Sequence, residues 1–519
     1  MKFHSLFIAF VVSLGGFLFG FDMGIISGVM DYAGPQFVLN ENQTGWVVSC
    51  PTFAAMFAML AAGAISNLCG RKPLLLAIAV LYAASAIWSA YAETYVMLYL
   101  ARMLGGVAFG AALIIAPTYI AEISKASNRG KLVSIQQLNI VVGFFAAFLC
   151  NWYLNLSYKA GVEWLTEENV WRWMLGIEIV PAVLYFFFLL FVPSSPRWLF
   201  TRGRTAEGHV ILQQLHGQDE GDAEAKAIKD SMEAQAGVAR GGYVELFNPK
   251  LGFVLLVGLA IGVLQQSTGI NAVFFYAVSI FKQTGIGQDA AFASGLLLST
   301  VNLLFTFVGI FLIDRLGRRP LMLIGIAGIA VSLMLCAFAF YQATYELTDE
   351  GIATLKESGG FSSQDLVVLA SQTNQKFEND VDFKQKMKDS LGKEVYDSNE
   401  GGILEVATKM NAKLVLAGIL GFIACFAFSL GPVMWVMLSE LYPNRIRGLA
   451  IGVIGFVNSC TAWFVSYIFP WEVSNLGNAI SFLIFGLIAA FGFFLLFFIL
   501  PETKGRSLEE LEAELVLKR

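Results

Sequence analysis

Side chains that could bind a neutral polar solute stand close together in one apolar stretch of the sequence. Gln265, Gln266 and Asn271 carry amides, whereas the residues on both sides of this run are almost all apolar. An unpaired amide in hydrocarbon costs several kcal/mol, so each should face protein, water or a ligand. Gly269 weakens the backbone here, as in the discontinuous helices of transporters. The run predicts a solute-binding site, and hydrogen bonding between helices is the alternative.

Three ionisable residues of the N-terminal part also fall inside apolar stretches. They are Asp22, Arg102 and Glu178. Ionisable groups at membrane depth are costly, so each is a functional candidate. If the three meet, two carboxylates compete for one guanidinium, and one of them should take up a proton near neutral pH. This pattern predicts a proton-coupling element, and a static buried ion pair is the alternative.

A further set of charges lies where apolar stretches end beside basic loops. Glu122 and Glu440 each end such a stretch. We expect them to pair with arginines at the cytoplasmic surface and to bias the equilibrium between two transport states, with ordinary interfacial charges as the alternative. The predicted cytoplasmic gate residues are Arg71, Glu122, Arg129, Asp314, Arg318, Glu440 and Arg447.

The composition is that of a membrane protein. Of the 519 residues, 57% are hydrophobic and 14% are charged, where a soluble protein would have about 25% charged residues. The six cysteines form no CxxC pair, and the three histidines lie outside the apolar stretches. We therefore expect no disulfide framework, no metal site and no cofactor, and a protein that is not an enzyme.

Twelve stretches are long and apolar enough to span a membrane. They are residues 5–30, 45–68, 73–91, 95–121, 131–155, 172–192, 250–282, 289–313, 320–343, 412–441, 448–470 and 476–500. Lysines and arginines gather in alternate loops, so the positive-inside rule places those loops and both termini in the cytoplasm. The sequence predicts an all-α membrane protein of twelve transmembrane helices.

An internal repeat divides these helices into two sets of six. Gly70-Arg71-Lys72 recurs as Gly317-Arg318-Arg319, and the Glu122 loop recurs at Glu440. More residues separate Glu122 from Glu440 than separate Gly70 from Gly317. An acidic insertion at 344–411 accounts for the difference. Two six-helix repeats of the same orientation are typical of the major facilitator architecture.

The repeat sets the predicted domains. They are an N-terminal bundle at 1–192, a cytoplasmic linker with short helices at 193–249, a C-terminal bundle at 250–500 with its outer-face insertion at 344–411, and a cytoplasmic tail at 501–519. For the insertion, a small helical cap and a solvated loop are both open. We expect the lipid bilayer as a partner, no nucleic acid, and a monomer.

The motifs resemble those of the sugar porter family of the major facilitator superfamily. They are Gly20-Phe21-Asp22, Arg102 with Gly105-Gly106, Pro117 to Glu122, Arg129-Gly130-Lys131, Pro193 to Leu199, Gln265 to Asn271, Asp314 to Arg319, Gly431-Pro432 with Trp435, and Pro501 to Gly505. The resemblance covers the chain apart from the insertion. It implies a monosaccharide ligand, pentose or hexose, and alternating access.

The resemblance also implies which residues bind the sugar. They are Phe19, Gln137, Gln265, Gln266, Asn271, Phe275, Asn302, Gly431, Trp435 and Asn458. Amides suit a ring covered with hydroxyls because they both donate and accept, and an indole offers it a flat apolar face. Phe275 stands where a Tyr is common and Ser459 where a Trp is common, which leaves the exact sugar open.

Asp22 decides between two modes of transport. The position is acidic in bacterial proton-coupled members such as the xylose–proton symporters and Asn in facilitative animal glucose transporters, and Arg102 and Glu178 also match the symporter pattern. The resemblance thus favours proton symport in a bacterial inner membrane, with facilitative uniport as the alternative. Ser194 replaces the usual Glu of its motif, and residues 67–72 lack the Asp-Arg pair seen at 314–315, so we expect a weaker N-terminal gate.

Overall fold

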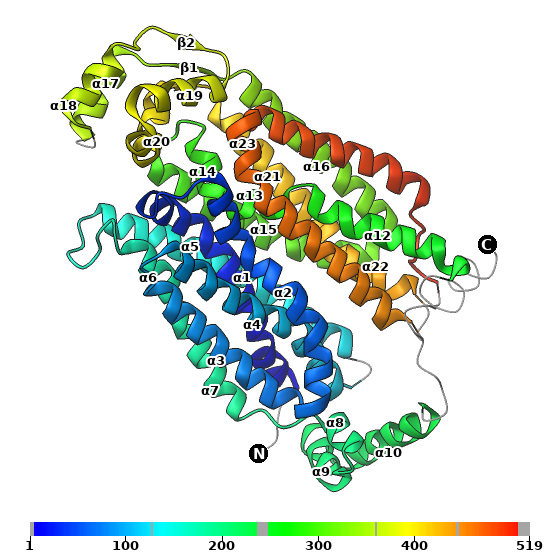
Figure 1. Cartoon of the computed structure of the whole chain (residues 1–519). Coiled ribbons are helices and arrows are strands. Elements are labelled where there is room, and N and C mark those ends of the chain that lie inside the picture. The colour runs from blue at the N-terminus through cyan, green and yellow to red at the C-terminus, as the bar shows by residue number, and fades with distance from the viewer. Residues whose placement is uncertain (1–4, 126–127, 236–247, 359–360, 443–445, 507–519) are drawn as a thin grey trace.

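The computed structural model describes residues 5–125, 128–235, 248–358, 361–442 and 446–506, which form two groups of long helices (Figure 1). The N-terminal half contains α1 (Ser5–Gln36), α2 (Glu41–Cys69), α3 (Arg71–Ala90), α4 (Tyr95–Ile123), α5 (Arg129–Lys159), α6 (Val170–Gly176) and α7 (Ile179–Leu190). The C-terminal half contains the 3-10 helix η1 (Pro249–Leu251) and α12 (Gly252–Ser267), α13 (Ile270–Phe275), α14 (Ala277–Lys282), α15 (Gln288–Leu316), α16 (Arg318–Tyr341), α21 (Ala412–Phe428), α22 (Leu430–Leu441) and α23 (Arg447–Ile499).

These helices account for the twelve predicted spans. Eleven described helical segments are long and apolar enough to cross a membrane. The last, α23, has 53 residues and contains Gly477 at φ +81°, so it comprises two spans joined at a bend. The prediction of twelve transmembrane helices is therefore confirmed.

Two further spans are interrupted at positions that the sequence explains. Gly269 has φ +85°, a left-handed conformation that favours glycine, and separates α12 from α13. The break between α21 and α22 lies at Ser429, just before Gly431-Pro432. Pro432 lacks the N–H that would bond to the carbonyl of Phe428, so it fits the first turn of α22 and α21 ends at Phe428.

The connection between the halves forms a small helical layer. It consists of α8 (Pro196–Thr201), α9 (Thr205–His216) and α10 (Gln218–Gln235). Phe200, Leu212 and Ala225 pack together inside it. Figure 1 shows this layer below the N-terminal half, at the end of the molecule that carries the arginine-rich loops. We call this the basic end.

Residues 344–411 fold into a cap at the opposite end, which we call the capped end (Figure 1). The cap contains β1 (Thr344–Glu346), α17 (Asp349–Ser358), α18 (Ser363–Ala370), β2 (Lys376–Phe377), α19 (Asp380–Leu391), α20 (Lys393–Ala407) and β3 (Thr408–Lys409). Its antiparallel sheet has the order β2-β1-β3 and pairs Tyr345 with Phe377 and Thr408. Tyr345, Phe383 and Tyr396 belong to a separate hydrophobic core. Of the two open possibilities, the insertion is thus a folded cap, and its sheet was not predicted.

The two halves are joined near the capped end. The backbone N–H of Val278 donates to Ser27 Oγ over 3.1 Å, and Lys282 Nζ lies 2.6 Å from Asp31 Oδ1. A cavity of about 780 Å³ lies between both halves and the cap. Residues of α1, α14, α15 and α20 line it. The described structure therefore has its halves closed on each other beneath the cap.

Candidate functional site

Three of the predicted sugar-binding residues meet in one amide cluster between α12 and α23. Asn458 Nδ2 donates to Gln265 Oε1 and to the Gly262 carbonyl, each over 2.8 Å. Gln265 Nε2 donates to the Leu430 carbonyl over 3.0 Å. Gln266 Nε2 lies 3.3 Å from both Asn458 Oδ1 and Gln265 Oε1. We call Gln265, Gln266 and Asn458 the amide cluster.

The members of the amide cluster differ in what remains available for a ligand. Gln265 is 4% exposed, and both ends of its amide are hydrogen-bonded within the protein. Gln266 Oε1 is buried and has no hydrogen-bond partner among the described residues. Because a buried acceptor without a donor is costly, Gln266 is the member best suited to accept from a hydroxyl group.

The other predicted C-terminal residues stand on separate helices. Asn271 on α13 is half-buried, and Asn302 on α15 is 7% exposed. Trp435 on α22 is 43% exposed, and its ring lies 3.8 Å from the place where a Cβ on Gly455 would be. Gly431 lies beside Phe426. No hydrogen bond between described side chains links Asn271 or Asn302 to the amide cluster.

The remaining predicted sugar-binding residues are two aromatic side chains and a glutamine of the N-terminal half. The Phe19 ring lies 4.8 Å from the Phe109 ring. Phe275 is 2% exposed and is the predicted sugar-binding residue found among the described residues that line the cavity under the cap. Gln137 on α5 is half-buried. Its neighbour Gln136, which was not among the predicted residues, is buried, and its Oε1 has no hydrogen-bond partner among the described residues. The doublet Gln136-Gln137, which parallels Gln265-Gln266, was the available signal.

Asp22 and Arg102 form an ion pair inside the N-terminal half. Arg102 Nη1 lies 3.2 Å from Asp22 Oδ1, and Arg102 Nε donates to the Val47 carbonyl over 3.1 Å. Glu178, at the junction of α6 and α7, is 4% exposed and within electrostatic range of both. Asp22 Oδ2 and Arg102 Nη2 have no hydrogen-bond partner among the described residues. One guanidinium therefore lies within electrostatic range of two buried carboxylates, an arrangement that can hold one proton.

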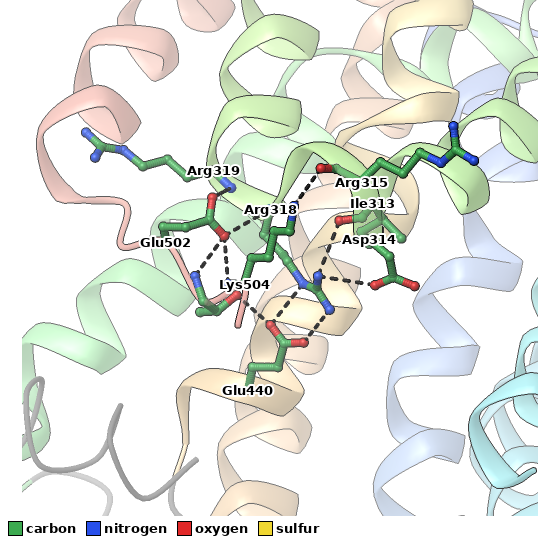
Figure 2. Close-up of polar contacts among 9 residues, drawn as sticks. Ile313, Asp314, Arg315, Arg318, Arg319, Glu440, Glu502 and Lys504 are labelled. Carbon is green, nitrogen blue, oxygen red and sulfur yellow. Dashed lines mark hydrogen bonds and ion pairs between the residues drawn. The ribbon is translucent and has the colours of Figure 1, made fainter. Parts of the chain in front are cut away.

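The predicted gate charges pair within each half rather than between the halves. Arg71 Nη2 lies 2.8 Å from Glu122 Oε1, and Ser195 Oγ donates to the same carboxylate. In the C-terminal half, Arg318 makes two hydrogen bonds to Glu440, of 2.8 and 3.2 Å (Figure 2).

The remaining gate candidates add little to these pairs. Asp314 lies 3.2 Å from Arg318 but its side chain is 81% exposed. Arg447 Nε donates to the Tyr442 carbonyl over 3.1 Å. The side chain of Arg129 lies outside the described residues. Residues 67–72 contain no counterpart of Asp314, and the weaker N-terminal gate stays a prediction.

The contacts that join the halves at the capped end were not predicted from the sequence. Asp31 of α1 accepts from Lys282 of α14 and from Gln288 of α15. Asn155 of α5 donates to Asp289 of α15 over 2.8 Å. Charges at span ends are ordinary, so the sequence offered no signal that these would pair.

Comparisons with known proteins match nearly the whole chain. The family model "Sugar (and other) transporter" matches residues 8–355 and 397–515. The arabinose-proton symporter of Bacillus subtilis (strain 168) is 31% identical over 513 residues, covering 98% of this chain and 95% of that protein. The D-xylose-proton symporter of Escherichia coli (strain K12) is 30% identical over 538 residues, covering 98% and 94%.

Solved structures show the same fold. The inward open conformation of the xylose transporter XylE from E. coli matches with a TM-score of 0.73 and 27% identity, covering 98% of this chain and 99% of that chain. A structure of the proton:xylose symporter XylE bound to 6-bromo-6-deoxy-D-glucose matches with a TM-score of 0.71 and 28% identity, with the same coverage. The chain is therefore an integral membrane protein of the sugar (and other) transporter family, a sugar porter of the major facilitator superfamily.

Proposed function

We propose that this protein is a monosaccharide–proton symporter that works by alternating access. The observation that carries the proposal is the buried Asp22–Arg102 pair, with Glu178 in electrostatic range. Two carboxylates that share one guanidinium can bind a proton and release it. The printed activities of the relatives, arabinose–proton and D-xylose–proton symport, support this assignment.

The sugar would bind between the halves, with Gln266 as its principal contact. Gln266 Oε1 is a buried acceptor without a described donor, and a sugar hydroxyl supplies one. In this proposal Gln265 and Asn458 hold Gln266 in place, because both are already hydrogen-bonded within the protein. The remaining contacts are assigned to Phe19, Gln137, Asn271, Phe275, Asn302, Gly431 and Trp435.

We further infer that the basic end, with both termini, faces the cytoplasm of a bacterial cell and that the cap faces outward. The basic loops support this orientation through the positive-inside rule. With this orientation, the contacts that close the halves at the capped end would lie on the outer side. The domain limits at 192, 249 and 500 and the monomeric state stay predictions. Arg71–Glu122 and Arg318–Glu440 would fix the basic end of each half while the halves rock.

Purified protein in vesicles with a pH indicator outside tests the proposal. Addition of D-xylose, L-arabinose or D-glucose to the outside should raise the external pH, because each sugar enters with a proton. Counterflow of labelled sugar without any pH change would instead identify a facilitative uniporter. Competition by charged solutes, with none by neutral monosaccharides, would remove the sugar assignment.

A further inference from the structure

The cap is attached to the C-terminal half through a buried polar network. Asp380 at the start of α19 is 7% exposed and accepts from the backbone N–H of Asn478 over 3.2 Å and from its Nδ2 over 2.8 Å. Lys384 Nζ donates to Gln283 Oε1 over 3.2 Å. Gly477 leaves room for this contact, since a Cβ there would lie 2.4 Å from Asp380 Oδ1. Buried charged hydrogen bonds of this kind are strong, so the cap and the C-terminal half move together.

The loop between α14 and α15 lies tightly beneath the cap. Gly285 and Gly287 both have positive φ, +78° and +73°. A Cβ on Gly285 would lie 3.0 Å from Thr408 Cβ, and one on Gly287 would lie 2.7 Å from Glu405 Oε1. The cap therefore fixes the position of residues 283–287.

This clamped loop is flanked by the two donors that hold Asp31 of the N-terminal half. Lys282 precedes the loop and lies 2.6 Å from Asp31 Oδ1, and Gln288 follows it and donates to Oδ2 over 2.5 Å. The Asp31 side chain is 6% exposed and that of Lys282 is 21% exposed. Among the described residues, Lys282–Asp31 is the ion pair that joins the halves.

The cap also touches the lysine itself. A Cβ on Gly401 of α20 would lie 2.6 Å from Lys282 Cε and 2.9 Å from Nζ. Helix α20 therefore passes directly against the ammonium group. A larger residue at 401 would displace the flexible end of Lys282 rather than the backbone of the cap.

We propose that the cap is the positioning element of a gate at the capped end. It holds Lys282 and Gln288 so that they lock Asp31, and the halves separate at this end only when those contacts break. The cap is attached to the C-terminal half, so it moves with that half when the gate opens. This assigns a role to an insertion of which residues 356–396 lie outside the matched family model.

Two adjacent glycines of α20 allow a matched test. A Cβ on Gly401 would collide with Lys282, whereas one on Gly402 would lie 3.5 Å from Leu355, an ordinary contact. The reporter is Ser27→Cys, since Ser27 lines the cavity and is 3% exposed while the gate is closed. Every variant carries it, so any weakening of its contact with Val278 is common to all of them. Its rate of reaction with a polar thiol reagent is read from the mass of its peptide, using purified protein in detergent.

Gly401→Ala should raise the reaction rate of the reporter roughly tenfold, a common size for such couplings, and Gly402→Ala should leave it unchanged. Lys282→Met should raise the rate similarly, and adding Gly401→Ala to Lys282→Met should change nothing more. Equal rates for Gly401→Ala and Gly402→Ala, or additive effects of Gly401→Ala and Lys282→Met, would overturn the positioning role. No effect of Lys282→Met would remove the gate itself. The reporter needs neither sugar nor proton, so failure of the proposed function would leave this result interpretable.

Discussion

Glu502 accepts hydrogen bonds from the backbone N–H groups of Arg318 and Arg319, one on each carboxylate oxygen and each 3.1 Å long (Figure 2). These N–H groups belong to the first turn of α16, which no helical carbonyl can satisfy. A carboxylate at this position also interacts favourably with the helix dipole. The tail that follows the last span is therefore fastened to the start of the ninth.

The N-terminal half repeats this arrangement without the carboxylate. Ser195 donates to Glu122 as Thr503 donates to Glu440, and Lys72 reaches the Leu190 carbonyl as Arg319 reaches that of Phe497. By this correspondence Ser194 stands where Glu502 stands. Helix α3 has no side-chain cap at its N-terminus.

We expect Ser194→Glu to supply the missing cap on α3. The new carboxylate should accept from the N–H groups of Arg71 and Lys72 and stabilise this helix end by about 0.5–2 kcal/mol. Hydrogen exchange of those two amides should slow by the corresponding factor. Glu502→Ser is the mirror control and should speed exchange at Arg318 and Arg319. Unchanged exchange in Ser194→Glu would mean that the two halves do not correspond here.

The amide cluster predicts opposite consequences for two neighbouring glutamines. Gln265→Ala would remove two buried hydrogen bonds, one to the Leu430 carbonyl and one from Asn458 Nδ2, so it should lower the free energy of unfolding by about 1–3 kcal/mol. Gln266→Ala removes an acceptor without a described donor and two long contacts of 3.3 Å, so stability should fall less than in Gln265→Ala.

Sugar affinity should be affected more by Gln266→Ala than by Gln265→Ala, the reverse of their effects on stability. Gln266→Ala should weaken monosaccharide binding by roughly tenfold or more, as loss of one buried hydrogen bond costs on the order of 1.4 kcal/mol. Calorimetric binding and thermal unfolding of both variants check the pair of expectations. Wild-type affinity in Gln266→Ala would show that this run of residues is structural.

The sequence was sufficient for features set by local composition. Span lengths predicted the twelve helices, because a bilayer demands a fixed length of apolar helix. The sequence also predicted a weak point in the backbone at Gly269, and the break between α12 and α13 lies there. Asp22 and Arg102 could be proposed as neighbours because charges at membrane depth must find partners, and the structure places them 3.2 Å apart.

Features set by long-range geometry could not be predicted. The strands of the cap contain two or three residues each, and their pairing depends on distant segments such as Tyr345 and Thr408. Adjacent glutamines point in different directions on a helix, so the sequence could not tell that Gln265 is satisfied and Gln266 is not. The Asp31–Lys282 contact depends on how the two halves are closed, which no local pattern encodes.

Protonation of one carboxyl group, that of Asp397, should make the cap more stable in acid than at neutral pH. Burial raises the pKa of Asp397 above its ordinary value, against the opposing effect of Lys388, and Glu400 and Glu41 raise it further. A carboxyl group with a raised pKa in the fold contributes stability below its unfolded pKa, and this is lost as pH rises through the folded pKa. Asp397→Asn should therefore protect the cap from proteolysis at pH 7 and flatten its pH dependence. Asp389→Asn, at an exposed position of the same cap, is the control and should behave as wild type.

Replacement of Asp22 should separate sugar exchange from sugar accumulation. In Asp22→Asn, Glu178 is the described carboxylate that remains within electrostatic range of Arg102, so the competition that binds a proton is gone. Sugar counterflow should continue, because no member of the amide cluster changes. Sugar accumulation against a gradient should be lost, so that the internal sugar concentration only equals the external one. The reason is that the membrane potential, worth roughly 2.3 kcal/mol per charge per 100 mV, is no longer coupled to sugar movement.

Asp219→Asn, at an exposed carboxylate of the linker, is the control and should accumulate sugar normally. Full accumulation by Asp22→Asn would assign the proton to another group, and loss of counterflow together with accumulation would mean that Asp22 supports folding or sugar binding instead.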